Sequence, residues 1–375
     1  MEFSRVVVVG IGLVGGSLAR ALHALPAERR AIVLGVDPDP ATLAYALAEG
    51  IVDDARGPDE AVAAGWFGPD FGAQLVVLAT PAAAAVAWLE RLGALGYRGV
   101  VTDVASTKSS VLAAARDHLA SAVFVGGHPM AGSERSGVEA SRGDLFVDAY
   151  YVLTPAPDTP ADVYSALHAL VTSLGARVIA IDPALHDDAV AVVSHAPHVA
   201  AAALIRLAAE RSRTSREGVM RLAAGGFKDT TRIAAGSPEL WAGICLDNAD
   251  ALRSAIASLV DDLEDFSASV SKGDTSEVLA WLASAAEVRR ALPARWVPAT
   301  ETLTELSVPV TDRPGAVADV TLAASHAGCN IEDIEIDHLS EATAVLRLVL
   351  TDEGDLDGLV EALKDGGFEP SRRPL

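Results

Sequence analysis

The sequence predicts an α/β protein with an open, doubly wound parallel sheet, followed by an all-helical domain and a small α+β domain. Residues 5–22, RVVVVGIGLVGGSLARAL, pass from a four-valine strand through glycines into a helix. Apolar strands that end in polar or glycine residues then alternate with helical stretches as far as Asp182. From Pro183 the pattern changes to long helices without strand alternation. The expected domains are residues 1–182, 183–297 and 303–375.

Three glycines after the first strand stand in the spacing G-x-G-x-x-G, which is typical of dinucleotide sites. Gly10 permits a tight turn, Gly12 leaves space for a pyrophosphate, and Gly15 lets the helix pack closely on the strand. Leu13 and Val14 open the helix, whose free N–H groups favour phosphate. The sequence therefore predicts a Rossmann-type dinucleotide-binding domain. A tight strand-to-helix turn without a ligand is the alternative.

An acidic residue ends the second strand, AIVLGVD. Asp37 lies 37 − 15 = 22 residues beyond Gly15, close to the roughly 20 residues at which a carboxylate hydrogen-bonds the adenosine ribose. A carboxylate there repels a 2′-phosphate, so we expect NAD rather than NADP. The alternative is that Asp37 caps the helix that follows Pro38.

Composition narrows the class of protein. The 375 residues carry a formal net charge of −22, which argues against binding to nucleic acid or to anionic membranes. We find no apolar run of about 18 residues that could span a bilayer and no signal peptide. The two cysteines, Cys245 and Cys329, lie in different expected domains, so we expect no disulfide and a cytoplasmic protein.

Polar residues follow three of the expected strands, which cover residues 74–81, 100–106 and 122–132. Ligands bind at the carboxyl ends of the strands in an open α/β sheet. The residues expected to line this crevice are Thr80, Pro81, Asp103, Ser106, Lys108 and His128. Two further strands, in AYYVLTP and ARVIAID, are expected around a helix from Asp162 to Leu174.

His128 is the candidate catalytic base of a dehydrogenase. Histidine can accept the proton of an alcohol near neutral pH while hydride leaves the same carbon. Ser106 and Lys108 could hydrogen-bond the same alcohol or the cofactor. The alternatives are that His128 merely ends a strand and that Ser106 caps the next helix.

The helical domain is expected to pack on a second copy of the chain, because its helices carry apolar faces and few loops join them. The expected helices cover residues 185–212, 215–225, 238–270 and 277–291. A self-contained monomeric bundle is the alternative.

Within this domain, Arg232 offers a planar fork that suits a carboxylate, although a salt bridge with Asp229 is an alternative. His195 and His198 are three residues apart, but no nearby spacing supplies a third ligand, so we expect no metal.

After a linker at residues 292–300, the tail has the order strand, helix, strand, strand, helix, strand. This is a split βαβ arrangement.

Taken together, GIGLVGGSLA, DVASTK, GGHPMAGSE, SHAPH, FKDTTRIA and SPELW resemble the prephenate dehydrogenase family of tyrosine biosynthesis, and the tail resembles an ACT regulatory domain. The resemblance covers nearly the whole chain. It implies an NAD-dependent oxidative decarboxylation of prephenate in a homodimer. It departs from the family at Ala105, where glycine is frequent.

The resemblance also implies roles for individual residues. His128, assisted by Ser106, would hydrogen-bond the ring hydroxyl, and Arg232 would hold the ring carboxylate. The residues that would contact the side chain or shape the pocket are Ser194, His195, His198 and Trp241. Aromatisation supplies the driving force, so the decarboxylation needs no metal.

Three alternatives to this activity remain open. Arogenate could replace prephenate, and a β-hydroxyacid dehydrogenase is disfavoured because its catalytic lysine motif is missing from the sequence. A protein that only senses NAD and an amino acid is disfavoured by the joint presence of His128, Ser106 and Arg232.

The resemblance to ACT domains points to an effector, for which tyrosine is the expected candidate. The matching positions are Asp312, Gly315, Asn330 and Ile331. The alternative is that the tail only strengthens dimerisation.

Overall fold

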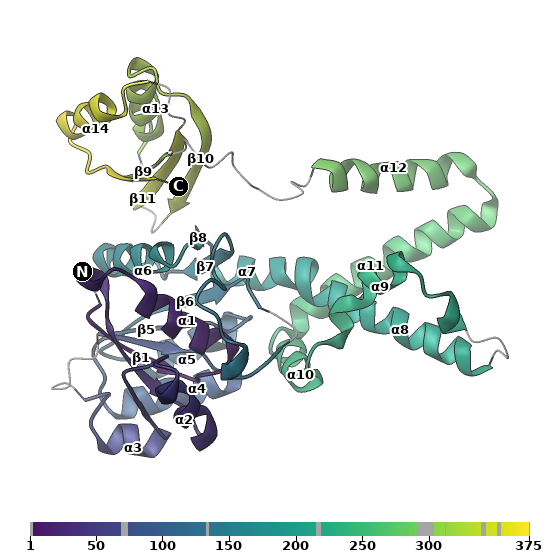
Figure 1. Cartoon of the computed structure of the whole chain (residues 1–375). Coiled ribbons are helices and arrows are strands. Elements are labelled where there is room, and N and C mark those ends of the chain that lie inside the picture. Colours follow the sequence, from purple (N-terminus) through teal and green to yellow (C-terminus); the bar gives the residue numbers. More distant parts are fainter. Residues whose placement is uncertain are drawn as a thin grey trace. The chain divides into compact units, whose positions relative to one another are not determined.

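We describe the protein from a computed structural model. It covers residues 3–68, 74–132, 135–214, 219–291, 304–311, 313–338, 343–350 and 354–374. The chain forms two compact units, Met1–Ala255 and Ile256–Leu375, and each is considered by itself (Figure 1).

Within the described residues, the first unit contains an eight-stranded sheet with the order β3-β2-β1-β4-β5-β6-β7-β8. The strands are β1 (Arg5–Val9), β2 (Ile32–Val36), β3 (Asp54–Arg56), β4 (Leu75–Leu78), β5 (Val100–Asp103), β6 (Val123–Pro129), β7 (Tyr150–Thr154) and β8 (Arg177–Ala180). The six neighbouring strands β3, β2, β1, β4, β5 and β6 are parallel, which confirms the doubly wound core. The order reverses between β1 and β4, so a crevice for a ligand opens at their carboxyl ends.

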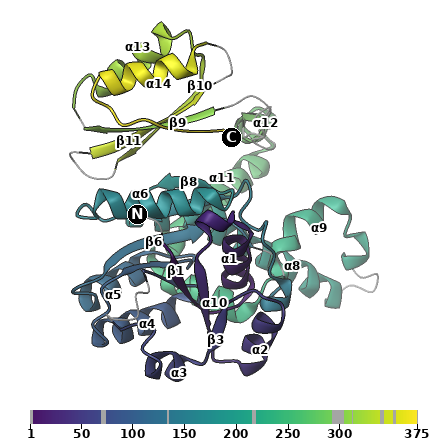
Figure 2. The same cartoon turned by 60° about the vertical axis from the view of Figure 1, so that its left-hand side comes forward.

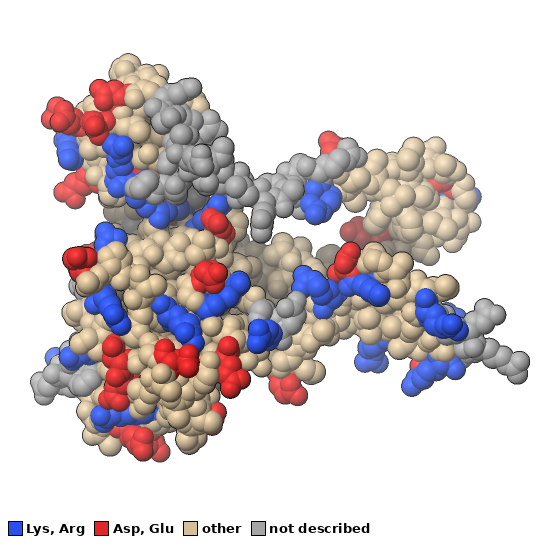
Figure 3. Space-filling model, viewed as in Figure 1, with Lys and Arg blue, Asp and Glu red and all other residues tan. Residues whose placement is uncertain are grey.

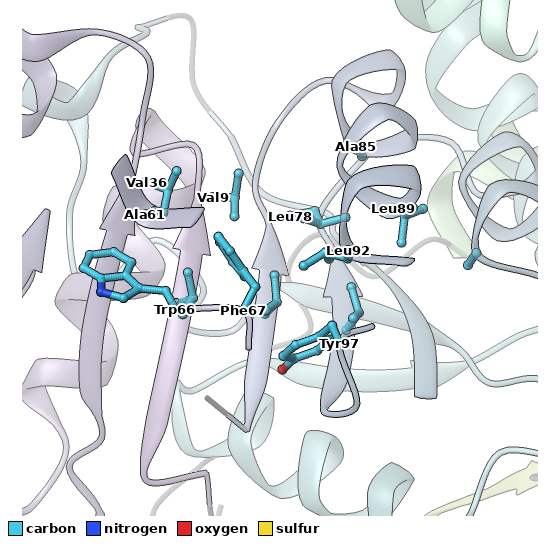
Figure 4. Close-up of a cluster of buried hydrophobic side chains, with 14 of the residues drawn as sticks. Val9, Val36, Ala61, Trp66, Phe67, Leu78, Ala85, Leu89, Leu92 and Tyr97 are labelled. Carbon is cyan, nitrogen blue, oxygen red and sulfur yellow. The ribbon is translucent and has the colours of Figure 1, made fainter. Parts of the chain in front are cut away.

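Helices cover both faces of the sheet, which explains why β1 is an unbroken run of valines. They are α1 (Leu13–Ala24), α2 (Pro40–Ala48), α3 (Pro58–Ala63), α4 (Ala82–Ala94), α5 (Ser109–His118) and α6 (Ala161–Ser173). Val7 and Val9 point into a core that also contains Phe67 and Leu89 (Figure 4). Val8, on the opposite face of the strand, is equally buried.

Two features of the sheet differ from the prediction. β3 was not predicted, because its three residues, Asp-Ala-Arg, carry no apolar run. β7 pairs antiparallel with β6, so the sheet is mixed and not wholly parallel. The reason lies in residues 130–149, whose described part contains a 3-10 turn at Val138–Ala140 as its one helical element and bonds to α1 through Ser141 and Arg142. A loop without a crossover helix returns the chain at the end where β6 stops.

The helical part that follows comprises α7 (Pro183–Val190), η3 (Ala191–His195), α8 (Ala196–Thr214), η4 (Val219–Leu222), α9 (Gly225–Thr231), η5 (Arg232–Ala235), α10 (Pro238–Asp247), α11 (Ala249–Lys272) and α12 (Thr275–Ala291). The helices predicted near residues 185–212 and 277–291 are confirmed. The one predicted over 215–225 is wrong, since its described part is a short 3-10 turn before α9. The predicted helix over 238–270 is interrupted at Asn248, whose side chain bonds to other elements.

One helical stretch, Pro183–Arg213, is long and apolar enough by composition to cross a membrane. About a third of the residues in its most apolar 18-residue segment are buried within the protein. This corrects the expectation that no such stretch exists. A core helix of a soluble protein meets the same criterion, and this stretch contains the buried polar residues His186 and Asp187. Acidic and basic side chains are interspersed over the sheet unit on the face shown in Figure 3.

The second unit ends in a small α+β domain. Its elements are β9 (Thr304–Thr311), α13 (Ala316–His326), β10 (Ile331–His338), β11 (Thr343–Leu350), α14 (Leu356–Asp365) and β12 (Ser371–Pro374). The antiparallel sheet has the order β10-β11-β9-β12, and α13 and α14 lie on one of its faces (Figure 2). Leu306, Leu346 and Leu359 are buried between the layers. This is the predicted split βαβ arrangement.

Candidate active site

The glycine turn between β1 and α1 has the geometry of a dinucleotide site. Gly10 has φ +91°, which favours glycine, and its N–H donates to Val36 O at 2.7 Å. A Cβ at Gly15 would lie 1.9 Å from Gly10 O, so only glycine lets the helix approach the turn. A Cβ at Gly12 would meet nothing within 4 Å. Space therefore opens in front of Gly12, where α1, with Leu13 and Val14 in its first turn, presents its N-terminus.

Asp37 follows β2 directly and faces this turn. One carboxylate oxygen accepts from Ile11 N at 2.9 Å and the other from Asp39 N at 2.9 Å. The helix-cap alternative is wrong for Asp37, because Asp39 caps α2 by accepting from Ala41 N and Thr42 N. Asp37 is thus placed beside the glycine turn, as an acidic residue for a ribose requires.

The end of β4 supplies a polar atom that fits a ligand. The Thr80 hydroxyl oxygen is buried and finds no hydrogen-bond partner among the residues that the structure describes. Buried polar groups in proteins are normally paired, so a ligand group at this point would satisfy it. Pro81 is exposed and is the N-cap residue of α4. These residues, with the space at Gly12, fit a dinucleotide.

The end of β5 differs from the expectation for Asp103 and Lys108. Both side chains are fully enclosed, with exposures of 0% and 1%, and they form an ion pair. Lys108 Nζ also donates to Gly127 O at 2.7 Å, and Asp103 accepts from Ala105 N and Gly127 N, each at 3.0 Å. Burial lowers the pKa of Lys108, and the Asp103 carboxylate opposes this shift. The pair joins β5 to β6, and both side chains are almost wholly buried, so the contacts seen here are structural and a ligand role for either residue stays a prediction.

Two more aspartates hold the turn between β5 and α5. Asp187 on α7 accepts from Lys108 N and Ser109 N, both at 2.8 Å. Asp247 on α10 accepts from the hydroxyls of Thr107 and Ser110. Asp187 therefore caps α5 from another helix, and the alternative in which Ser106 caps α5 is wrong. Ser106 lies half-buried within this fixed turn.

His128 lies near the end of β6, buried to 8% exposure. Its Nδ1 lies 2.8 Å from His186 Nε2, and the two rings meet edge to face. His186 Nδ1 in turn lies 2.8 Å from Asp187 Oδ1. A continuous chain of contacts thus leads from His128 through His186 to the carboxylate of Asp187.

Burial lowers the pKa of His128 well below the usual value of histidine. A positive charge on Lys108, His186 or His195 would act in the same direction, and the charge of Asp187 opposes it. His128 is therefore neutral at pH 7. A neutral imidazole can accept a proton from an alcohol, which is what a dehydrogenase base must do.

The SHAPH motif surrounds an indole ring. His198 stacks on Trp241 with ring centroids 3.5 Å apart, and His195 meets the same ring edge to face. His198 Nδ1 is buried without a hydrogen-bond partner among the described residues. Burial lowers the pKa of both histidines, so they present neutral rings. Ser194, half-buried, precedes His195 in the π-helical turn η3.

Asn248 connects this cluster to the relay from His128. Its Nδ2 donates to the backbone carbonyl of Asp187 at 2.7 Å and lies 3.3 Å from His195 Nδ1. His195 Nδ1 is then an acceptor, so its proton is on Nε2.

Arg232 begins η5, which packs against α8, and its side chain is exposed. The turn ends at Gly236, where a Cβ would lie 2.8 Å from Trp241 Nε1 and 3.6 Å from His198 Cε1. The short helix of Arg232 thus ends against the His198–Trp241 pair. Within the described residues, no group of three His, Cys, Asp or Glu side chains could hold a metal.

Four residues of this network were not predicted from the sequence: His186, Asp187, Asp247 and Asn248. The signal for the first two was a His-Asp pair in a helix that begins directly after the last strand of the sheet, at Asp182-Pro183. Asp247 and Asn248 carried no signal, because they lie inside what reads as one continuous helix.

The fold and the glycine turn together define a dinucleotide-dependent dehydrogenase. Comparison with known proteins gives the family. Residues 18–180 match the model described as prephenate dehydrogenase, nucleotide-binding domain, and residues 182–284 match the corresponding dimerization domain.

Relatives extend this match over most of the chain. The chain is 32% identical to prephenate dehydrogenase of Bacillus subtilis over 354 residues, or 93% of each chain. The solved prephenate dehydrogenase of Aquifex aeolicus, in complex with hydroxyphenyl propionate and NAD+, matches 78% of this chain and 99% of its own, with 28% identity and a TM-score of 0.70. Arogenate dehydrogenase of Synechocystis matches 76% of this chain and 99% of its own, with 30% identity and a TM-score of 0.64. The chain belongs to the prephenate dehydrogenase family.

Proposed function

We propose that this protein is an NAD-dependent prephenate dehydrogenase that oxidatively decarboxylates prephenate to 4-hydroxyphenylpyruvate. The observation that carries the proposal is the buried, neutral His128 at the carboxyl end of the same sheet that holds the glycine turn. NAD, when bound at that turn, supplies the hydride acceptor. Family membership and the solved relative with NAD+ support the same activity.

The reaction then proceeds in three steps at the substrate ring. His128 Nε2 accepts the proton of the ring hydroxyl, and the O–H electron pair forms the carbonyl as hydride leaves the same carbon. The bond from the ring to the carboxylate then breaks, carbon dioxide departs, and the electron pair enters the ring. The ring oxygen regains its proton from His128, and the product is a phenol.

Arg232 is proposed to bind the ring carboxylate. It is exposed at the start of η5, whose far end reaches the His198–Trp241 pair. An arginine fork binds a carboxylate through two parallel hydrogen bonds. It must not stabilise the carboxylate so strongly that decarboxylation slows, because only differential binding of the transition state speeds the step.

Ser106, Ser194 and the rings of His195, His198 and Trp241 are proposed to surround the substrate. The stacked His198–Trp241 pair offers a flat surface against which a ring or a planar side chain can pack.

The experiment that tests the activity follows NADH absorbance with the purified chain and NAD, offered prephenate and arogenate in parallel. We expect turnover of prephenate. Faster turnover of arogenate would favour the alternative substrate, which the Synechocystis relative is named for. Failure with both substrates, in a folded protein that binds NAD, would favour the sensing protein.

We propose a cytoplasmic homodimer formed by the helical domain. In α11 only Leu252 is buried within the chain, and large apolar side chains such as Leu259, Leu263 and Val270 are exposed. An amphipathic helix whose apolar side is uncovered in one copy can be covered by a second. The match to a dimerization domain supports this, and light scattering of the full chain tests it.

The tail is proposed to be an ACT domain that binds tyrosine. Gly315, with φ +93°, is the N-cap residue of α13, and Asn330 directly precedes Ile331, the first residue of β10. Asp312 lies outside the described residues. Tyrosine can slow catalysis from this unit only if it favours a less active state of the enzyme. If a chain that ends at Ala299 is inhibited as strongly as the full chain, tyrosine acts at the active site instead.

A further inference from the structure

We propose that Asp187 and His186 form a relay that holds His128 in the tautomer with its proton on Nδ1, which leaves Nε2 free to act as the base. His186 and Asp187 are thus positioning residues for His128. The inference rests on the proposed function, because it concerns the same base, and it adds two residues and a protonation state to it.

The Asp187 carboxylate fixes which group donates in its contact with His186. Asp187 accepts from Lys108 N, Ser109 N and His186 Nδ1, all at 2.8 Å. Burial alone would raise the pKa of Asp187, but these hydrogen bonds outweigh it and lower the pKa to about 2. The carboxylate is therefore ionised at neutral pH and can only accept. The shared proton of the His186–Asp187 contact belongs to His186 Nδ1.

The next contact in the relay is the one between His186 and His128. In the proposed relay, His186 Nε2 carries the lone pair and accepts from His128 Nδ1, which lies 2.8 Å away. The only tautomer of a neutral His128 that donates from Nδ1 has Nε2 unprotonated. Such a chain also stabilises the imidazolium that forms when Nε2 takes the hydroxyl proton, because the positive charge is connected to the Asp187 carboxylate.

The charged and titratable groups that act on His128, or that pair with such a group, come from β5, the start of α5, α7 and η3. Lys108 at the start of α5 disfavours a second cation, and its own charge is paired with Asp103 at the end of β5. A charge on His195, in η3, would also oppose a proton on His128, and His195 is held by Asn248 with Nδ1 as an acceptor. Asp187 is the anion whose charge favours a proton on His128.

Hydrogen bonds to backbone groups also hold the relay in place. Asn248 donates to the backbone carbonyl of Asp187, and the Asp187 carboxylate is locked on two amides of α5. His186 is 2% exposed, so its orientation is set by packing as well as by its two polar contacts. A residue that served packing alone would not need both ring nitrogens engaged.

The test compares His186→Leu, which removes the relay, with His186→Gln, whose carbonyl can still accept from His128 Nδ1. We expect kcat to fall by about 100-fold in His186→Leu, because wrong-tautomer variants of comparable relays lose up to about 10⁴-fold. In His186→Gln we expect kcat to be about tenfold higher than in His186→Leu. The KM for prephenate and the Kd for NAD should be unchanged in both variants. His23→Leu is the matched control, since His23 also contacts an aspartate, Asp53, and a carbonyl, in the last turn of α1. It should retain the wild-type kcat.

A second measurement reads the tautomer without any turnover. In ¹⁵N NMR of the histidine-labelled full chain, with His128→Asn to assign the signals, we expect a protonated Nδ1 and an unprotonated Nε2 on His128. A proton on Nε2 would overturn the relay, and so would an unchanged kcat in a folded His186→Leu. If the wild type does not oxidise prephenate, the proposed function fails, and the tautomer still decides the relay.

Discussion

The two ends of the proposed active site are built from different parts of the chain. The dinucleotide end is made by one local segment, in which Gly10, Gly12 and Gly15 shape backbone between β1 and α1. The proposed catalytic end is made by side chains from separate elements: His128 comes from β6, and His186 and Asp187 come from α7. One end depends on the absence of side chains and the other on their orientation.

This difference determines how each end responds to change. At the dinucleotide end, an added carbon atom either has space or collides with backbone. At the catalytic end, each group is held by another side chain, so the loss of one partner alters the protonation or the direction of the next. Single substitutions should therefore distinguish the two ends. A change at one end should weaken NAD binding, and a change at the other should lower turnover while NAD binding is retained.

The largest effect is expected at His128. His128→Asn removes the base while the glycine turn and Asp37 are unchanged. Turnover should fall by about two to four orders of magnitude, the usual contribution of a positioned base, and the Kd for NAD should stay near wild type. Steady-state kinetics and NAD titration by calorimetry measure both. Unchanged turnover would remove His128 from the mechanism.

Arg232→Ala should produce a smaller effect, and mainly on the substrate. Hydrogen bonds to charged groups contribute about 1.5–3 kcal/mol, so the KM for prephenate should rise by roughly 10- to 100-fold while NAD binding is retained. Arg232→Lys is the matched control, because it keeps the charge but loses the planar fork. An unchanged KM with a lowered melting temperature would instead indicate that Arg232 serves stability.

The same contrast explains what the sequence could predict. The glycine turn, Asp37 and the split βαβ tail were predictable because neighbouring residues determine them. The network around His128 was not, since His186 follows it by 58 residues and Asn248 lies at an unexpected break between two helices. The reversal of β7 also escaped prediction, because the strand pattern carries no direction and the loop before it decides the pairing.

Two glycines test whether the dinucleotide end depends on backbone alone. In Gly15→Ala the new carbon atom would meet Gly10 O, so the turn or α1 must shift. Overpacking of this kind costs about 1–3 kcal/mol, and thermal unfolding should show it. Gly12→Ala enters open space, so it should leave the melting temperature unchanged and weaken only NAD binding. Equal destabilisation by both would contradict this distinction.

The smallest effect is expected at Asp37, where charge rather than space decides. The unmodified enzyme should prefer NAD, because a carboxylate near the ribose repels the 2′-phosphate of NADP; at about 4 Å two charges interact with roughly 1 kcal/mol in water and more when partly shielded. Asp37→Asn removes this charge but keeps an oxygen that can accept from Ile11 N, whereas Asp37→Ala removes both. We therefore expect the ratio of kcat/KM for NAD and NADP to shift by about tenfold or more toward NADP in both variants, with the larger loss of NAD binding in Asp37→Ala. If the unmodified protein uses NAD and NADP equally well, Asp37 does not face the ribose, and its bond to Ile11 N serves only to hold the glycine turn.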